Sequence, residues 1–307
     1  MEKHPIGSVV NFCSNERRFL KACLDQASLF SKQIVVPVCD HFFDGIPENR
    51  KLLDEVYEAF PHIQFIEYPF IPARIPKKVW KWVAPSSFWH SLSRLIGFHF
   101  LKDEIETVLF LDADEIADGK RFSEWLDCSD YQLHMALKLA NYWYFREPCY
   151  RSLKWEDSVV MAQKKALKGE LILRKEERDA IYDSLPGPKR RHVIGVNGEP
   201  MFHHYSWVRT EEEMMKKVGS WGHKHDRDWP DLVRKEFSKP FQGTDFIHGY
   251  QYQTVDSLFE ITLQETSFPK KGAKNVRRLS EKDVLQLVRC KKSPFWEWLS
   301  QFFFFSN

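Results

Sequence analysis

The sequence predicts an α/β fold with a mixed, mostly parallel sheet, helices on both of its faces and a helical C-terminal extension. Short apolar runs alternate with amphipathic segments from residue 6 to residue 68. This β-α-β-α-β order is typical of a parallel sheet that is covered on both sides. A further apolar run over residues 107–111 fits the same sheet, because three of its five residues are strong strand formers.

The first strand is expected over residues 6–12, where the run is apolar and is followed by a turn at Ser14-Asn15-Glu16. After this turn, apolar residues recur at helical spacing over residues 17–30, which predicts a helix with one apolar face. The later elements follow from the same two criteria: a strand over 33–39, a helix over 49–60, a strand over 63–68, a helix over 88–102 and a strand over 107–111.

The connecting segments are less regular. Residues 69–85 are rich in Pro and Lys, include Trp80 and Trp82, and predict a loop over the carboxyl ends of the strands. Past Asp118 the pattern is mixed, with a strand predicted over residues 132–141. Residues 162–191 are strongly charged and are interpreted as a mobile connection, with a solvated helix over 164–182 as the alternative.

The composition is that of a soluble globular protein, with 43% hydrophobic and 29% charged residues. A net charge of +2 argues against general nucleic-acid binding. A length of 307 residues predicts a main domain over 1–265 and an extension over 266–307. Six cysteines without a C-x-x-C pair, no signal peptide and no run of 18 apolar residues predict a cytoplasmic protein with reduced thiols.

The C-terminal extension combines basic and aromatic residues. Residues 270–278 are basic, and the run from Phe295 to Leu299 is followed by four phenylalanines from Phe302. Such a tail favours peripheral contact with the inner face of a membrane, because aromatic rings and basic side chains bind anionic lipid surfaces. The alternative is that the tail packs on its own domain or on a partner.

The most informative segment is Asp112-Ala113-Asp114-Glu115, which directly follows the apolar strand over 107–111. Burying an unpaired carboxylate is costly, so carboxylates at this place need a cation or several hydrogen-bond donors. Oxygen ligands at a strand end suit Mg²⁺ or Mn²⁺ with a phosphate-bearing substrate. Asp40 closes the strand over 33–39 and is expected at the same edge of the sheet, where open α/β sheets bind ligands. The alternative is that the aspartates cap the next turn or helix.

The order of these parts resembles that of a nucleotide-sugar glycosyltransferase of the GT-A type, a Rossmann-like fold, and is most similar to families 2 and 17. Five stretches carry the resemblance. They are Val9 to Leu20 with its Asn-Glu turn, Ile34 to Asp40, the R-x-x-G helix segment from Arg94 to Gly97, the D-x-D segment from Leu109 to Ile116, and His203-His204-Tyr205-Ser206-Trp207. The chain departs from family 2 after the second strand, where His41-Phe42-Phe43-Asp44-Gly45 replaces Asp-Gly-Ser.

The resemblance implies metal-dependent transfer of a sugar from a nucleotide-diphosphate sugar to a glycan, lipid or protein acceptor. A divalent ion, Mn²⁺ or Mg²⁺, would neutralise the charge that develops on the diphosphate. The implied metal ligands are Asp112, Asp114 and His204, with His203, His223, His225 and His248 as further candidates. The implied nucleotide-sugar contacts are Asn11, Asn15, Glu16, Asp40, Arg94 and Asp112.

An inverting reaction requires a carboxylate that accepts the proton of the acceptor hydroxyl. Asp157, in Trp155-Glu156-Asp157, lies after the D-x-D segment beside aromatic residues, and Asp245 is the second candidate. The alternative for each is a cap or a surface charge.

Two other classes of function stay open. A phosphatase of the haloacid-dehalogenase type would use Asp112 as its nucleophile, although that motif usually opens its domain and here three predicted strands precede it. A non-catalytic nucleotide-sugar or glycan-binding module would retain the same fold without turnover.

Overall fold

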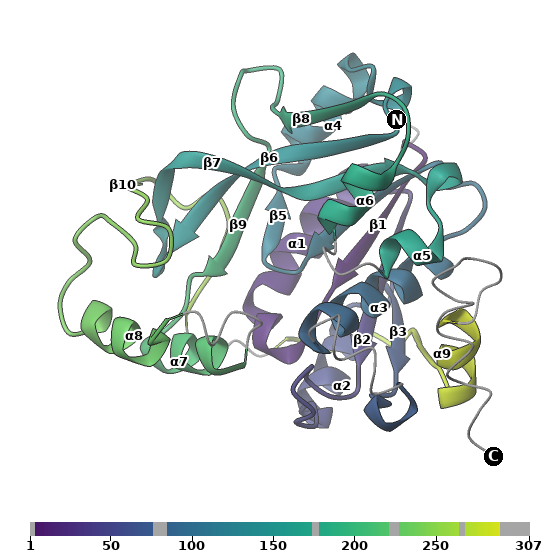
Figure 1. The fold of residues 1–307 in the computed structure, drawn as a ribbon, viewed down its shortest axis with the longest axis horizontal. Helices are drawn as coiled ribbons and strands as arrows, with labels where there is room; N and C mark the ends of the chain where they lie inside the picture. Colours follow the sequence, from purple (N-terminus) through teal and green to yellow (C-terminus); the bar gives the residue numbers. More distant parts are fainter. Residues whose placement is uncertain (1–3, 76–84, 174–177, 221–226, 264–267, 289–307) are drawn as a thin grey trace.

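The computed structural model describes residues 4–75, 85–173, 178–220, 227–263 and 268–288. At its centre the described strands form one sheet in the order β11-β3-β2-β1-β4-β7-β6-β9-β5, with β8 beside β6 and β10 beside β7 (Figure 1). The strands are β1 (Ile6–Asn11), β2 (Gln33–Cys39), β3 (Gln64–Tyr68), β4 (Thr107–Asp112), β5 (Glu115–Ala117), β6 (Ala136–Phe145), β7 (Glu147–Gln163), β8 (Lys189–Val193), β9 (Phe202–Trp207), β10 (Tyr252–Thr254) and β11 (Val276–Arg278).

The sheet is mixed and mostly parallel, which confirms the predicted fold class. The pairs from β11 through β3, β2 and β1 to β4 are all parallel. Strand β7 then runs antiparallel to both β4 and β6, and β5 runs antiparallel to β9. From β1 the chain adds β2 and β3 on one side, and β4 later joins on the other side. The carboxyl ends of β1 and β4 therefore flank a point where strand order reverses, the usual place for a ligand crevice.

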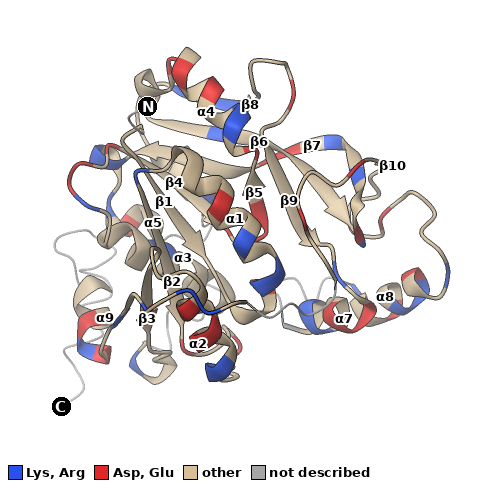
Figure 2. Ribbon diagram, turned by 180° about the vertical axis from the view of Figure 1, so that it is seen from behind, with Lys and Arg blue, Asp and Glu red and all other residues tan. Residues whose placement is uncertain are grey.

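Helices cover both faces of the sheet because the buried strands are apolar on both sides. Val10, Val36 and Leu109 belong to the core under the first helical layer, and Val9 and Val108 belong to the core under the second. Figure 2 shows that the charged residues concentrate on helices and loops, while β1 and β2 carry none. The first layer contains α1 (Arg17–Phe30), α2 (Arg50–Ala59) and α4 (Gly119–Cys128), and the second contains α3 (Pro85–His99), α5 (Gly169–Ile172), α6 (Arg178–Ser184) and α9 (Glu281–Val288).

A third, smaller core joins the helices α7 (Glu211–Ser220) and α8 (Trp229–Phe237) to the sheet. Trp143 and Phe145 of β6 and Trp207 of β9 form its sheet side. Met214 of α7 is fully buried against them. This packing fixes α7 beside the end of β9 (Figure 1), so residues of the two elements meet at one edge of the sheet.

Helix α3 lies unusually close to β1 because residue 97 is a glycine. A Cβ atom at Gly97 would collide with the side chain of Val9. Arg94 lies one turn before Gly97 in the same helix, and only 1% of it is exposed. The close approach therefore brings a long cationic side chain under the sheet next to β4.

The predicted elements of the first half agree with the structure within a few residues. The ranges of α1 and β2 are those predicted, and α3 begins at Pro85 instead of residue 88. The strand predicted over 132–141 begins only at Ala136, because residues 131–133 form a 3-10 turn. The loop predicted over 69–85 contains a 3-10 turn at Pro72–Arg74, and Trp80 and Trp82 lie outside the described residues.

The prediction for residues 162–191 is wrong in both of its forms. Instead of one helix over 164–182, the described residues form two short helices, α5 and α6, followed by β8. Ile181 of α6 is fully buried against the sheet, and β8 pairs with β6. The connection packs on the domain through buried apolar residues at positions 172, 173, 180 and 181, although many of its other residues are charged.

The described part of the C-terminal extension packs on the main domain. Strand β11 pairs with β3, and Val284 and Val288 of α9 belong to the core under α3. The aromatic segment from Ser293 to Asn307 lies outside the described residues, so its membrane contact stays a prediction. Within the described ranges, no helix combines the length and the apolar character needed to span a bilayer.

Candidate functional site

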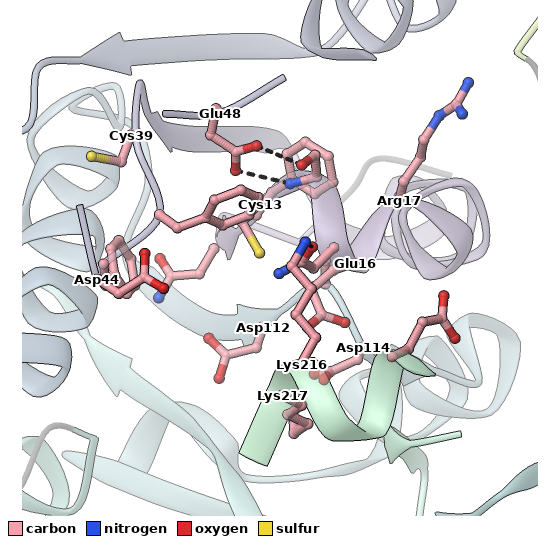
Figure 3. Close-up of a pocket in the computed structure, with 18 of the residues that line it drawn as sticks. Cys13, Glu16, Arg17, Cys39, Asp44, Glu48, Asp112, Asp114, Lys216 and Lys217 are labelled. Carbon is pink, nitrogen blue, oxygen red and sulfur yellow. Dashed lines mark hydrogen bonds between the residues drawn. The ribbon is translucent and has the colours of Figure 1, made fainter. Parts of the chain in front are cut away.

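A cavity of about 1430 Å³ opens at the carboxyl ends of β1 and β4. This volume exceeds the roughly 300–1,000 Å³ of pockets for a single small ligand, so a nucleotide and a second group would both fit. Four segments form its walls: the turn over 13–18, the loop over 41–49, the start of α3, and the stretch from β9 to α7. Its polar lining residues include Asn11, Glu16, Ser86, His90, Asp112, Asp114, His204, Arg209, Lys216 and Lys217 (Figure 3).

Asp112 ends β4 and is held by arginines from two helices. Arg94 Nη2 of α3 donates to both of its carboxylate oxygens, at 3.0 and 3.3 Å. Arg178 Nη2 of α6 lies 3.3 Å from Asp112 Oδ2. Burial opposes ionisation, but Arg178 and then Arg94 outweigh it and hold the pKa of Asp112 well below its usual range. Asp112 is therefore a fixed anion in the cavity wall.

Glu115 completes this arrangement from behind the cavity. Its carboxylate is fully buried and accepts hydrogen bonds from Arg178, from Ser158 Oγ at 2.7 Å and from the backbone N–H of Asp112 at 2.9 Å. Burial opposes ionisation of this group as well, yet Arg178 holds the pKa of Glu115 below its usual range. All of these contacts are internal, so Glu115 supports the D-x-D segment and does not face a ligand.

Asp114 has a different environment, although it is only two residues from Asp112. It is 5% exposed and lines the cavity, and its Oδ1 atom has no hydrogen-bond partner among the described residues. Burial, and then repulsion from Glu16, raises the pKa of Asp114 to about 6. An unpartnered buried carboxylate oxygen is costly, so this position favours a bound cation.

His203 and His204 point to opposite sides of β9, as expected for neighbours on a strand. His204 lines the cavity, and its Nε2 atom lies 3.7 Å from Asp114 Oδ1, too far for a hydrogen bond. His203 is 3% exposed and accepts or donates a hydrogen bond of 2.8 Å with Tyr144 Oη in the core. Burial lowers the pKa of His203 to about 3. Of these two histidines, only His204 is placed to contact a ligand in the cavity.

The pair Asp114 and His204 suits a divalent ion whose remaining ligands come from elsewhere. Among the described residues, no group of three or more His, Cys, Asp or Glu side chains is arranged to hold a metal. Mg²⁺ typically takes one or two carboxylates together with substrate phosphates and water, at about 2.1 Å from each oxygen. Adjacent ligands of such an ion stand about 3 Å apart, close to the 3.7 Å between these two side chains. His223 and His225 lie outside the described residues, and His248 does not line the cavity.

Positive charges approach Asp114 from the stretch that links β9 to α7. Arg209 Nη2 donates to Glu16 Oε1 at 2.6 Å, and Lys217 Nζ donates to Ser206 Oγ at 2.7 Å. Burial opposes the charge of Glu16, but Arg209 and then Lys217 hold its pKa below the usual range. Burial, and then Arg209, lowers the pKa of Lys217. Figure 3 shows Asp114, Glu16 and the two neighbouring lysines gathered at this end of the cavity.

The opposite wall is formed by the loop over 41–49, whose lining residues are partly aromatic and partly polar, and it is held by a carboxylate. Glu48 is 8% exposed and accepts hydrogen bonds from both the backbone N–H, at 3.0 Å, and the hydroxyl of Ser14 (Figure 3). This clamp joins the loop over 41–49 to the turn after β1. Lys216 reaches across the opening, donates to Asn15 Oδ1 at 2.9 Å and lies 5.0 Å from the ring of Phe42. These contacts connect the loop over 41–49 to the turn after β1 and to α7.

The predicted nucleotide-sugar contacts divide into two groups. Asn11, Asn15, Glu16 and Asp112 line the cavity, and both polar side-chain atoms of Asn11 are buried without a hydrogen-bond partner among the described residues. Asp40 and Arg94 are not among the lining residues. Asp40 Oδ1 accepts hydrogen bonds from the Phe70 backbone and from His41, both at 2.7 Å. Arg94 is bound to Asp112 instead of pointing into the cavity.

The two predicted bases do not reach the cavity. Asp157 of β7 pairs with Arg191 at 3.2 Å and with Lys138 at 3.5 Å on another part of the sheet. Asp245 is 3% exposed and accepts hydrogen bonds from four successive backbone N–H groups, those of residues 247 to 250. It also accepts one from Tyr252 Oη at 3.0 Å. The structure thus places Asp157 in an ion-pair cluster and Asp245 inside a turn, which are the alternatives that the sequence had left open.

Sequence reasoning missed two functional candidates, Arg178 and Arg209, and it had noted Lys217 only as part of the resemblance, without a role. Arg178 lies in the segment that was expected to be mobile, and nothing in its local pattern indicates a partner at Asp112. Arg209 and Lys217 follow His203-His204-Tyr205-Ser206-Trp207 at short distance, and a strand running directly into a helix next to that motif is the signal that would have suggested them.

Comparison with known proteins adds little to this geometry. No model of a known protein family matches the chain, and no curated protein sequence matches it. Among solved structures, 4-diphosphocytidyl-2C-methyl-D-erythritol synthase from Anaerococcus prevotii is similar at 10% identity over 68% of this chain and 92% of that one, with a TM-score of 0.41. The glycosyltransferase GlyE of Streptococcus pneumoniae is similar at 11% identity over 76% of this chain and 63% of that one, with a TM-score of 0.38. Such low scores carry no argument about function.

Proposed function

We propose that this chain transfers a sugar from a nucleotide-diphosphate sugar to a glycan, lipid or protein acceptor, with Mn²⁺ or Mg²⁺ as cofactor. The observation that carries the proposal is the unpartnered, buried Oδ1 atom of Asp114 beside His204. It lies in a large cavity where the strand order of the sheet reverses. Asp114 and His204 would hold the metal, which supplies Lewis acidity that neutralises charge on the diphosphate.

The charges around this point suit a diphosphate. Lys216, Lys217 and Arg209 line the same end of the cavity as Asp114. A diphosphate that lies between these side chains would place its oxygens against cations on one side and leave others for the metal. Cationic groups fixed in a partly dry site stabilise developing negative charge more strongly than water does. These residues would thus bind the donor and assist departure of the nucleoside diphosphate.

The hydroxyl-rich parts of a nucleotide sugar suit the residues at the ends of β1 and β4. The amide of Asn11 offers one acceptor and two donors, and the Asp112 carboxylate offers further acceptor positions. Unsatisfied buried polar atoms gain most from a ligand that pairs with them, since they lost their water on folding. Phe42 and Phe43 line the cavity from the loop over 41–49, and they would contact the flat nucleoside base.

A phosphatase with Asp112 as nucleophile is supported less well. Arg94 contacts both oxygens of that carboxylate, and Arg178 contacts one of them. Two guanidinium groups fix the carboxylate and lower its nucleophilicity. We therefore retain transfer from a nucleotide sugar as the proposed function and treat a binding module as an outcome of the test.

The test is a screen of nucleotide-diphosphate sugars for Mn²⁺-dependent release of the nucleoside diphosphate, with and without added acceptors. Wild-type protein should hydrolyse or transfer from at least one donor, and Asp114→Asn should not. A folded wild-type protein that binds a donor without releasing any product would be a binding module. A protein that binds no nucleoside diphosphate at all would contradict the proposed function.

A further inference from the structure

The two carboxylates of the D-x-D segment, Asp112 and Asp114, have different charged neighbours. Arg94 from α3 and Arg178 from α6 both contact Asp112, whereas Asp114 has the imidazole of His204 as its neighbour, at 3.7 Å. Asp114 instead has one side-chain oxygen without a hydrogen-bond partner in the described part of the chain. Two aspartates that the sequence presents as equivalent are therefore already different before any ligand binds.

This difference separates the residues that can accept a metal ion. A divalent cation on Asp112 would lie next to two guanidinium groups and would be repelled by both. The same cation on Asp114 would satisfy the unpartnered Oδ1 atom, and the two nearby cations, Arg209 and Lys217, already bond to Glu16 and Ser206 instead of to Asp114. The metal is therefore expected on the Asp114 side, and the Asp112 carboxylate stays available as a hydrogen-bond acceptor.

Arg178 has a stronger hold on Asp112 than its single contact suggests. Its guanidinium also bonds both oxygens of Glu115, and Glu115 in turn accepts the backbone N–H of Asp112 at 2.9 Å. One side chain thus fixes both the carboxylate and the backbone of Asp112. Ser158 adds a hydrogen bond of 2.7 Å to the same glutamate, so the anchor is attached to β7 as well.

We propose that Arg178 is a positioning residue that holds Asp112 as an acceptor for hydroxyl groups of the donor and leaves the divalent cation to Asp114 and His204. This inference rests on the proposed function, because it divides the roles within that site. Arg178 itself is not among the lining residues and acts through Asp112. The segment that carries it, α6, is therefore part of the donor site although it lies behind the wall of the cavity.

The test compares binding of Mn²⁺ alone with binding of nucleoside diphosphates, measured by titration calorimetry. The variants are Asp112→Asn, Asp114→Asn, Arg178→Lys and the double variant Asp112→Asn with Arg178→Lys. The ligands are Mn²⁺ and then the diphosphates of uridine, guanosine, cytidine and adenosine in the presence of Mn²⁺. Arg191→Lys is the matched control, since Arg191 pairs with an aspartate outside the cavity. Thermal melting checks that each variant is folded.

Asp114→Asn should weaken Mn²⁺ binding at least about 10-fold, whereas Asp112→Asn and Arg178→Lys should change it by less than about threefold. Both of the latter variants should weaken binding of the preferred diphosphate about 10-fold. In the double variant the two losses should not add, because residues that act through one contact are not independent. The control should match wild type in every titration.

Three results would count against this inference. Loss of Mn²⁺ affinity in Asp112→Asn equal to that in Asp114→Asn would show that Asp112 is a metal ligand. Fully additive losses in the double variant would show that Arg178 does not act through Asp112. Wild-type affinity of a folded Arg178→Lys for the diphosphate would show that its fork geometry is not needed. The first result overturns the division of roles between the two aspartates, the other two overturn the positioning role of Arg178, and none of the three overturns the proposed function. A folded wild-type protein that binds neither Mn²⁺ nor any diphosphate overturns the proposed function and this inference with it.

Discussion

The two sides of the cavity come from different halves of the chain and carry opposite charge. The side formed by the ends of β1 and β4 supplies acceptors, and it comes from residues 11–114. The side formed by β9 and α7 supplies a histidine and cations, and it comes from residues 204–217. Figure 3 shows both sides meeting around Asp112 and Asp114. Neither half makes a binding site alone, because the acceptors need a cation and the cations need an anion.

The two sides also hold each other in place. Arg209 pairs with Glu16 at 2.6 Å across the boundary, and Lys216 reaches Asn15 at 2.9 Å. These contacts satisfy part of the charge on each side while no ligand is bound. At Asp114 this compensation is incomplete, because one oxygen of its carboxylate has no hydrogen-bond partner among the described residues.

The largest effect is expected for Asp114→Asn, which should lower Mn²⁺-dependent turnover at least about 100-fold. The acidic side would then lack its proposed metal ligand. In the absence of metal the variant should melt at the same temperature or slightly higher, because burial and then Glu16 already disfavour the Asp114 charge. Turnover assays and thermal melts measure both effects, with Asp103→Asn, an exposed aspartate, as the control. Undiminished turnover would remove Asp114 from the metal site.

A second effect separates the two histidines of β9. His204→Ala should weaken Mn²⁺ binding about 10- to 100-fold with little change in stability, since His204 faces the cavity. His203→Ala should leave Mn²⁺ affinity unchanged but lower the free energy of unfolding by about 2–4 kcal/mol, because it empties a buried site beside Tyr144. Titration with Mn²⁺ and urea unfolding measure the two quantities. Equal Mn²⁺ affinities in the two variants would locate the histidine ligand elsewhere.

A smaller effect tests the cationic side. Lys217→Met should weaken binding of the preferred nucleoside diphosphate about 10-fold, since a charged hydrogen bond contributes about 1.5–3 kcal/mol. The dependence of affinity on salt should become shallower in the same variant, because one cation has been removed. Lys235→Met is the control, as that lysine lies on α8 and pairs with Asp231. A Lys217→Met protein with wild-type affinity would mean that the diphosphate lies away from α7.

A fourth effect concerns acid sensitivity and belongs to the core beside the cavity, where no ligand binds. Burial, and then Arg121, lowers the pKa of His203 to about 3 from an ordinary value near 6.5. Below pH 6.5 the unfolded chain binds a proton at this residue that the folded chain does not. The free energy of unfolding should therefore fall by up to about 1.4 kcal/mol for each pH unit between 6.5 and 3.

His203→Phe should remove this contribution while it keeps an aromatic ring in the core. Urea unfolding of both proteins across that pH range gives the difference in slope. Parallel pH profiles of wild type and variant would show that another group dominates the acid sensitivity.

The first half of the fold, from β1 to β4, could be predicted because each of its strands and helices has a clear pattern of apolar residues. Strands β1 to β4 are apolar on both faces and are separated by amphipathic helices, so their order and the meeting of Asn11 with Asp112 follow from the pattern. Strands β7 to β9 mix polar with apolar residues, and β8 and β9 join β6 from far along the chain, which leaves no comparable signal.

The site residues follow the same division. Asp112 and Asp114 could be predicted because strand ends meet at one edge, but the partner Arg178 depends on where α6 packs. Asp157 does not line the cavity, and the sequence could not indicate this because side-chain direction along β7 depends on pairing register. Asp245 accepts a hydrogen bond from the backbone of Gly249, whose φ is 71°. An aspartate followed closely by a glycine is typical of a turn, so the sequence did contain a signal for this role.

The close fit between α3 and β1 has an electrostatic result. Gly97 lets the helix approach Val9, and this approach is what allows Arg94, one turn earlier, to reach both oxygens of Asp112. Any side chain at residue 97 would lift the helix and withdraw the guanidinium. The absence of a side chain at Gly97 therefore determines whether the Arg94 guanidinium can contact Asp112. A Cβ atom at residue 97, outside the cavity, would thus leave the negative charge of Asp112 inside the cavity less well compensated.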